Sequence, residues 1–401
     1  MTSLAEGKNI LKMRKLDQKL LQIGYMLFVF VSVMSLSSWN LYFAKIINFN
    51  TTMIIFVLAS LVLVSVISDW TITRIAAVIV FSGLLLVYFQ LYRSSYILPV
   101  LLSLIVGTGF HVKTVLKCDF YSRLVSVILV VVLSLFSILP KSGYGADLTD
   151  FHFTIFCYGF TYANILAFEI AVLFVESLLV FKSKMGYQFL LVIIVTIVEI
   201  QLGYETGAVF CIVGYFVYYT TRQSSTKMTK IYLTAATLFV PIFTFISVYI
   251  AKMYSSTDTL WNSINDLLSG RAEIWQYYYQ AMPIKPWGNL QTINQKTMGV
   301  VGFGAFDGAF IQFLLTFGVI SILLLFFLLF LVTISKREIK NKRILAVLIL
   351  PIVLSGFTET NGFLVTFSPF YMLISANLFS VAQEVSLEST PGTLTVSEEV
   401  K

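Results

Sequence analysis

The sequence predicts an all-α polytopic membrane protein with about twelve transmembrane helices, within a range of roughly ten to twelve. Of its 401 residues, 58% are apolar and only 12% are charged, and the mean hydropathy is +0.88. A soluble domain is about 45–50% apolar and about 25% charged, so this chain has too few charges to cover its apolar side chains in water. The composition excludes disordered, collagenous and nucleic-acid-binding classes. The net charge of +7 is attributed to cytoplasmic loops.

Apolar segments follow one another along most of the chain and predict the spans. They cover residues 20–41, 53–67, 75–91, 96–110, 124–139, 162–181, 187–201, 208–220, 231–250, 310–335, 344–357 and 364–379. Several are shorter than the about 20 residues that a bilayer requires, so the pairs around Arg93 and around Tyr204 are also open to a re-entrant interpretation.

The spans divide the chain into five parts. These are an N-terminal tail (1–19), transmembrane helices 1–9 (20–250), a large polar loop (251–309), transmembrane helices 10–12 (310–379) and a C-terminal tail (380–401). The C-terminal tail is rich in Ser, Thr and Glu and is predicted to be disordered.

The distribution of Lys and Arg predicts that both termini lie in the cytoplasm. Five cations precede the first span, without the pattern of a cleaved signal peptide: Lys8, Lys12, Arg14, Lys15 and Lys19. With twelve spans, most of the 27 Lys and Arg residues fall on the same side as this tail, which is the bias of cytoplasmic loops. The loop 251–309 is then the large extracytoplasmic loop.

Acidic residues inside spans are the first candidates for function, because charge is costly in a bilayer. Glu169 and Glu176 lie in the sixth span and Glu199 in the seventh. Their spacing puts Glu169 and Glu176 on one helical face, toward the bundle interior. Such a residue either ties helices together or belongs to a proton relay or polar cavity. For Glu176 the structural role is favoured; for Glu169 both stay open.

The large loop contributes a cation and a carboxylate. Arg271 is its single arginine and has the planar fork of donors that suits phosphate oxygens, or it pairs locally with Asp266 or Glu273. Asp307 precedes the tenth span between glycines, and it is either a ligand contact or a helix N-cap.

Few residues could serve other chemistry. His152 is a lone loop histidine, which is either a surface residue or a base. Three cysteines without CxxC spacing and two histidines give no disulfide framework and no metal site. No nucleotide motif is present. No cofactor, metal or nucleic acid is therefore expected.

The second half of the chain resembles the O-antigen polymerase and O-antigen ligase superfamily, which includes capsule and exopolysaccharide repeat-unit polymerases. The resemblance rests on the order and spacing of short motifs. They are Gly-Phe-x-x-x-Asn at 159–164, Gly-Arg, Trp and Pro-x-Gly between 270 and 288, Asp307 with Gly318 eleven residues later, and Gly-x-Thr-Glu at 356–359. Asp307 stands where ligases have histidine, which favours a polymerase.

Two positions depart from the family pattern. The family often has Ser-Arg-Thr at the outer end of the seventh and eighth spans, whereas this chain has Tyr-Glu-Thr-Gly at 204–207, so that arginine is missing. Gly308 replaces the asparagine expected after the acid.

The resemblance implies a GT-C-like, metal-independent and inverting membrane glycosyltransferase in the plasma (inner) membrane of a bacterium. The donor would be an oligosaccharide on polyprenyl (undecaprenyl) pyrophosphate, and the acceptor a sugar hydroxyl of another lipid-linked repeat unit. A flippase and a chain-length regulator of the same pathway are the expected protein partners, besides membrane lipid.

The same resemblance assigns site residues. Asp307 is the first candidate for the base, followed by His152 and Glu169. The candidates for binding pyrophosphate or sugar are Arg271, Asn164, Trp275, Trp287 and Glu359. Three alternatives stay open: a flippase or transporter of lipid-linked oligosaccharide, an O-antigen ligase, and a binding scaffold of the assembly complex.

Overall fold

The computed structural model describes residues 2–66, 70–92, 97–142, 156–181, 184–223, 225–289 and 306–380. Within these ranges the chain is helical and contains no β-strand, apart from an isolated bridge between Ser37 and Phe160. The longer helices are α1 (Thr2–Leu36), α3 (Thr51–Val66), α4 (Ile72–Tyr92), α5 (Ile97–Gly107), α6 (Val112–Leu135), α7 (Ala163–Val180), α8 (Met185–Gln201), α9 (Glu205–Gln223), α10 (Ser225–Met253), α11 (Thr259–Leu267), α12 (Arg271–Ala281), α14 (Val319–Ile334), α15 (Ile339–Ser355) and α16 (Phe370–Phe379). Short elements are α2 (Trp39–Phe43), α13 (Ala309–Gln312), the π-helical η2 (Phe313–Phe317) and the 3-10 helix η3 (Asn361–Phe363).

The helices have the length and composition of a membrane protein. Five described segments are long and apolar enough to cross a bilayer: Gln18–Leu36, Ile72–Leu91, Val112–Leu135, Ala163–Val180 and Thr226–Met253. Five shorter apolar helices accompany them: Thr51–Ser65, Ile97–Gly107, Met185–Gln201, Val319–Ile334 and Phe370–Phe379. The predicted class, a helical membrane protein, agrees with this structure, while the number of spans stays a prediction.

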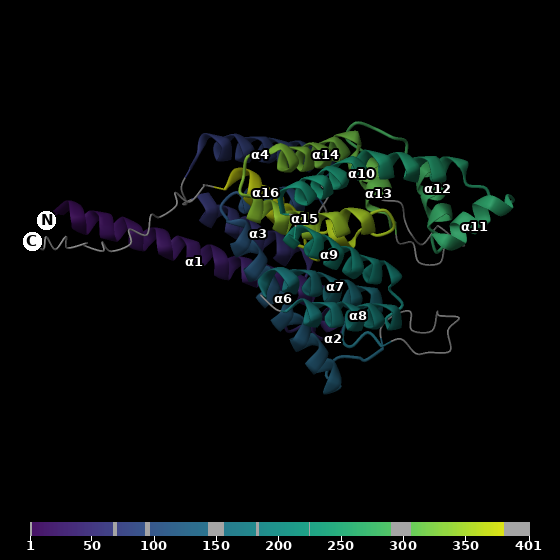
Figure 1. Cartoon of the computed structure of the whole chain (residues 1–401), viewed down its shortest axis with the longest axis horizontal. Helices are drawn as coiled ribbons and strands as arrows, with labels where there is room; N and C mark the ends of the chain where they lie inside the picture. The colour runs from purple at the N-terminus through teal and green to yellow at the C-terminus, as the bar shows by residue number, and fades with distance from the viewer. Residues whose placement is uncertain are drawn as a thin grey trace, which may run out of the picture.

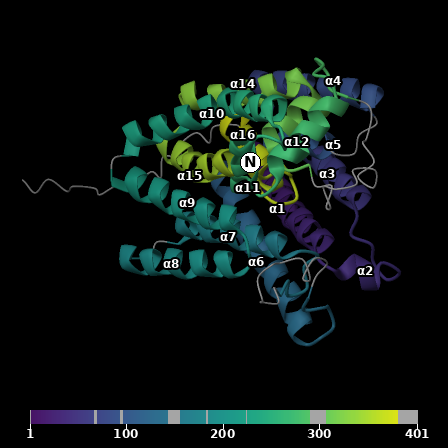
Figure 2. The same ribbon diagram turned by 90° about the vertical axis from the view of Figure 1, so that its right-hand side faces the viewer.

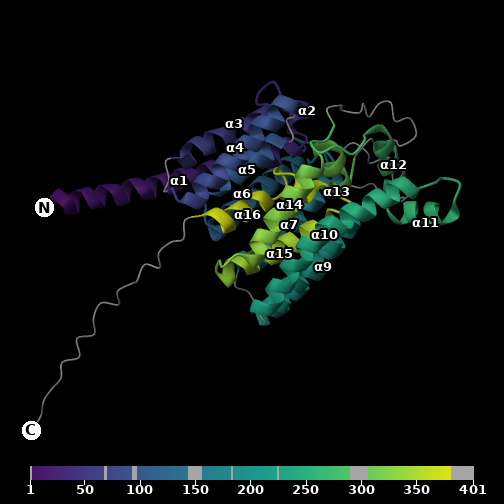
Figure 3. The same ribbon diagram turned by 90° about the horizontal axis from the view of Figure 1, so that it is seen from above.

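The helices lie side by side in one bundle (Figure 1). Helix α1 packs on α3 and α6, and α7 packs between α6 and α9. Helix α15 lies against both α9 and α10, with α8 on the outer side of α9 (Figure 2). Helices α11 and α12 follow the end of α10 and lie at one end of the bundle, away from the N-terminus (Figure 3). We call this the α12 end.

Helix α6 differs from the prediction. The predicted span begins at residue 124 and leaves Arg123 in a cytoplasmic loop, whereas the helix begins at Val112 and includes both Asp119 and Arg123 in its buried face. The hydropathy of the segment falls at these charges, but the charges neutralise one another inside the bundle, so the helix continues through them.

The predicted single span 310–335 is two helical pieces. The short α13 and η2 stop at Gly318, and α14 starts at Val319. The loop before it closes the break: Val319 N donates to Lys285 O at 3.1 Å, and Asn289 N donates to Thr316 O at 3.2 Å. Backbone groups freed by the break are thereby paired, as buried peptide groups must be.

Two glycines allow this backbone-to-backbone contact. Gly288 and Gly318 both have φ of +86°. A Cβ at Gly288 would lie 2.2 Å from Thr316 O, and a Cβ at Gly318 would lie 2.3 Å from Pro286 O. The Pro-x-Gly motif at 286–288 therefore has a structural role, which is to hold the loop against the break in the helix.

Candidate functional site

Three segments that are distant in sequence meet at Arg271. This residue opens α12, while Asp307 lies two residues before α13 and Glu359 follows α15. Arg271 Nη2 lies 3.6 Å from Asp307 Oδ2 and donates a short hydrogen bond to Glu359 Oε1. We call Arg271, Asp307 and Glu359 the Arg271 cluster.

Trp275 holds two of these segments together. It lies one turn after Arg271 on α12, is fully buried, and its Nε1 donates to the main-chain oxygen of Asp307 at 2.7 Å. Its ring packs edge-on against Phe357, two residues before Glu359, at 5.5 Å. Trp275 thus positions both carboxylates relative to the guanidinium rather than facing a ligand.

The segment of Glu359 is also fixed by main-chain bonds. Ala309 N, at the start of α13, donates to the carbonyl oxygens of Gly356 and Glu359 at 2.8 and 3.2 Å. The turn after α15 is therefore joined to the helix that follows Asp307. Since both carboxylates are attached to one rigid corner, their separation is set by the fold.

Burial and mutual repulsion control protonation in the cluster. Burial and the neighbouring Asp307 raise the pKa of Glu359 to about 8, against the opposing effect of Arg271. Burial also raises the pKa of Asp307, and Arg271 opposes that rise. One guanidinium cannot neutralise both carboxylates, one buried and one partly buried, so the group binds a proton near neutral pH. With that proton bound, the cluster has one cation and one anion.

The cluster is open to ligands on one side. The Asp307 side chain is 29% exposed and that of Arg271 is 16% exposed, whereas Glu359 is almost completely covered at 4%. An ionised Asp307 can accept a proton from a bound hydroxyl. Arg271 can contact an oxyanion while Glu359, at the back, carries the proton.

The other predicted site residues lie elsewhere. His152 is outside the described residues. Asn164 is exposed on the first turn of α7, and no described hydrogen bond joins it to the cluster. Trp287 packs edge-on against Tyr88 at 5.6 Å and belongs to the closure of the helix break. Glu169 is completely buried and pairs with Arg123.

Tyr204 is a neighbour that the sequence did not identify as part of the site. It is buried in the turn between α8 and α9. Its own burial and the carboxylates of Glu359, Glu199 and Asp307 raise its pKa well above the usual range. The only sequence signal for this was an aromatic residue directly before a helix start.

A second group of charges is buried within the bundle. Arg123 Nε donates to Asp119 Oδ1 at 2.8 Å, and Arg123 Nη1 donates to Glu169 Oε2 at 2.7 Å. Tyr25 Oη donates to the other oxygen of Asp119 at 2.7 Å. Glu176 is completely buried, as its spacing from Glu169 predicted. Asp119 and Glu169 are both paired with Arg123, which fits a tie between α1, α6 and α7, whereas neither oxygen of the Glu176 carboxylate has a hydrogen-bond partner among the described residues. We call these buried charges the Arg123 cluster.

Among the described residues, no group of three or more His, Cys, Asp and Glu residues is arranged to hold a metal ion. The three cysteines are buried. No protein-family model matches the chain, and no curated protein or solved structure matches it either.

Proposed function

We propose that the protein is a polysaccharide repeat-unit polymerase of the O-antigen, capsule or exopolysaccharide type. The contact of Arg271 with Asp307 and Glu359 carries this proposal. A transferase that uses a pyrophosphate leaving group needs a cation for the departing oxygens and a base for the attacking hydroxyl. The Arg271 cluster provides both within one partly exposed group.

In the proposed reaction the Arg271 guanidinium binds the pyrophosphate of a polyprenyl-linked glycan. Asp307 takes the proton of the acceptor sugar hydroxyl, and the hydroxyl oxygen attacks the anomeric carbon. The bond from that carbon to the pyrophosphate oxygen breaks, and polyprenyl pyrophosphate leaves. A single displacement inverts the anomeric configuration.

Glu359 and Trp275 have supporting roles in this proposal. A proton on Glu359 reduces the negative charge beside Arg271, so that a pyrophosphate can approach the guanidinium. Trp275 fixes the main chain of Asp307 and thereby its distance from Arg271. Glu359 thus controls the charge beside Arg271, and Trp275 controls the distance between Arg271 and Asp307. Among the described residues, neither Asn164 nor Trp287 has a contact that supports a role at this centre.

The proposed setting is the plasma membrane of a bacterium, with both termini in the cytoplasm and the α12 end outside. The fold would be GT-C-like. The apolar helices are the support for a location in a membrane. The motif resemblance is the support for a bacterial plasma membrane and for the GT-C-like fold, and the distribution of Lys and Arg is the support for the orientation. A lipid-linked substrate presented on the outer face would then reach the Arg271 cluster without crossing the bilayer.

The direct test uses purified protein and a lipid-linked repeat unit, with product size read on a gel. Wild type should give a ladder of longer glycans, and Arg271→Ala should leave single units. Lys285→Ala is the matched control, because Lys285 is an exposed cation in the same loop and lies outside the cluster. A normal ladder from Arg271→Ala, or no polymer from wild type, would contradict the proposal.

The Arg123 cluster favours a second candidate, a flippase or transporter of lipid-linked oligosaccharide. Ionisable groups buried between spanning helices are common in proton-coupled carriers. A deletion strain separates the candidates. Single lipid-linked units outside the membrane indicate loss of a polymerase, and units trapped inside indicate loss of a flippase. Long unattached chains indicate loss of an O-antigen ligase.

A further inference from the structure

Four cations converge at the end of the bundle opposite the α12 end. Arg222 lies at the end of α9, Lys230 in the second turn of α10, and Lys342 and Arg343 in the first turns of α15. Because α15 packs against both α9 and α10, these helix ends lie next to one another. We call Arg222, Lys230, Lys342 and Arg343 the basic cluster.

The charges of the basic cluster repel one another. Burial and the nearby Lys230 lower the pKa of Lys342. Burial also lowers the pKa of Arg343, and Arg222 acts in the same direction, while Tyr218 opposes the shift. No ion pair in the described part of the chain joins any of the four to a carboxylate.

Arg222 and Lys230 are exposed, whereas Lys342 and Arg343 are partly buried. The Lys342 ammonium donates to Thr333 O at 3.0 Å, but the Nε of Arg343 has no hydrogen-bond partner among the described residues. Partly buried positive charge without a counter-charge is unfavourable, so the site favours an added anion.

Arg343 is held in place by an aromatic ring. Its guanidinium carbon lies 5.1 Å from the centroid of the Tyr218 ring. The Tyr218 hydroxyl oxygen in turn accepts a hydrogen bond of 3.2 Å from Gln188 Nε2, on α8. Gln188 is almost completely buried, and its Oε1 has no hydrogen-bond partner. The cation is thus connected through Tyr218 to the space between α7 and α8.

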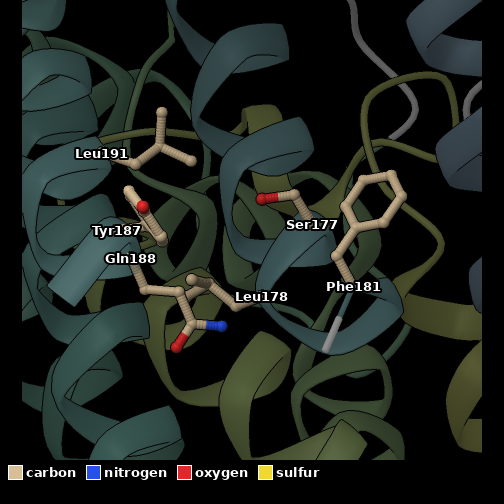
Figure 4. A pocket seen from close by; sticks show the side chains of 6 residues that line it. All are labelled: Ser177, Leu178, Phe181, Tyr187, Gln188 and Leu191. Carbon is tan, nitrogen blue, oxygen red and sulfur yellow. The ribbon is translucent and has the colours of Figure 1, made fainter. Parts of the chain in front are cut away.

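That space is a cavity of about 350 Å³. Figure 4 shows the side chains that line it, which come from the end of α7 and the start of α8 and are mostly apolar: Ser177, Leu178, Phe181, Tyr187, Gln188 and Leu191. A cation cluster linked to an apolar cavity has the two parts needed to bind an amphiphilic anion. Such pairs of features at helix ends match a phosphate head group with an attached alkyl chain.

We propose that the basic cluster and this cavity form a binding site for an anionic glycerophospholipid of the adjacent leaflet. The head-group phosphate contacts Arg222 and Arg343, and one acyl chain enters the cavity beside Gln188. In the predicted topology this leaflet is the cytoplasmic one. The site is separate from the Arg271 cluster and does not depend on the proposed function.

The test measures lipid binding to the purified full chain. Delipidated protein is mixed with phosphatidylglycerol or phosphatidylcholine, and retained lipids are counted by native mass spectrometry. Wild type should retain phosphatidylglycerol preferentially. Arg222→Gln with Arg343→Gln should weaken that binding about tenfold or more. The matched control is Lys113→Gln with Lys117→Gln, which removes two exposed cations from α6, on the same predicted membrane side.

Two further arms separate a lipid from a free anion. Ser177→Phe fills the cavity without changing charge, and it should reduce phosphatidylglycerol binding. Inorganic phosphate at millimolar concentration should not displace the bound lipid from wild type. Displacement by phosphate would indicate a simple anion site.

The proposal is overturned if wild type shows no preference for phosphatidylglycerol, or if both double variants lose it equally. The wild-type measurement alone can reject it, so the test remains decisive even if a variant does not fold. Folding of each variant is checked by size-exclusion chromatography.

Discussion

Trp275 Nε1 donates a hydrogen bond of 2.7 Å to the main-chain oxygen of Asp307. The donor belongs to the helix that begins with Arg271, and the acceptor belongs to the residue whose carboxylate faces Arg271. One buried indole therefore fixes the relative placement of the cation and the candidate base. The precision of the candidate site depends on this bond.

Replacing Trp275 with Phe removes the bond and keeps most of the packing. We expect polymer formation to fall about two- to tenfold, because a hydrogen bond of this kind contributes about 0.5–1.5 kcal/mol. Reaction rate and protein level are measured together. Trp261→Phe is the matched control, since Trp261 lies on α11 and forms no hydrogen bond through its indole among the described residues. An equal loss in both variants would mean that the effect comes from the loop as a whole.

Glu359→Gln tests the proton held by the Arg271 cluster. The folded-state pKa of Glu359, about 8, is above its value of 4.5 in the unfolded chain. Wild type therefore loses the stability contributed by this group as pH rises from about 4.5 to about 8. Glutamine imitates the protonated form, so the variant should avoid this loss. The difference in melting temperature, variant minus wild type, should increase by several degrees between pH 5 and pH 9.

Asp307→Asn in the same pH series shows how far the two carboxylates titrate together. Removing the charge of Asp307 should lower the pKa of Glu359, because repulsion from Asp307 helps to raise it. The upper end of the pH window in which stability is lost should then move to lower pH, while the lower end stays at the unfolded pKa. A difference between Glu359→Gln and wild type that is constant with pH would refute the bound proton.

Gly288→Ala and Gly318→Ala test the closure of the helix break. Each added Cβ would lie within 2.3 Å of main-chain atoms of the opposing segment, and each residue has a positive φ. We expect each variant to lose about 2–4 kcal/mol of stability or to express poorly. Gly83→Ala on α4 is the control, because a Cβ there meets nothing within 4 Å. If all three variants have the same melting temperature, the two backbones do not approach as described.

Arg123→Met tests the buried charges between α6 and α7. It leaves Asp119 and Glu169 without their cation, and we expect a loss of about 3–5 kcal/mol, measured by thermal unfolding in detergent. Lys117→Met removes an exposed cation of the same helix and should have little effect. Adding Asp119→Asn and Glu169→Gln to Arg123→Met should restore most of the stability, since the two carboxylates that had lost their cation are then replaced by neutral amides. A triple variant as unstable as Arg123→Met would exclude charge as the cause.

The helical membrane class was predictable because apolar content is a property of the whole chain. Details that depend on contacts between residues far apart in the sequence were not predictable. Local sequence offered Asp266 and Glu273 as partners for Arg271, whereas the structure uses Glu359, 88 residues away. Likewise, the break at Gly318 lies within an uninterrupted apolar run, and it depends on a loop that packs against it.

Charged residues inside helices were the other source of error. The apolar segment 124–139 predicts that Arg123 lies in the loop before that span. Its two carboxylates, one of them on another helix, make burial possible, and hydropathy has no information on such pairing.

The backbone bonds between Lys285 or Pro286 and the first residues of α14 have a consequence for engineering this chain. A chimera that exchanges residues 254–289 for those of another protein would cut these bonds, even though the exchanged piece looks self-contained. The exchanged piece has to include residues 313–320 as well, because the backbone donors of that segment are matched to the backbone acceptors of the loop. The exchangeable unit in this molecule is therefore defined by these backbone hydrogen bonds and not by the order of segments along the chain.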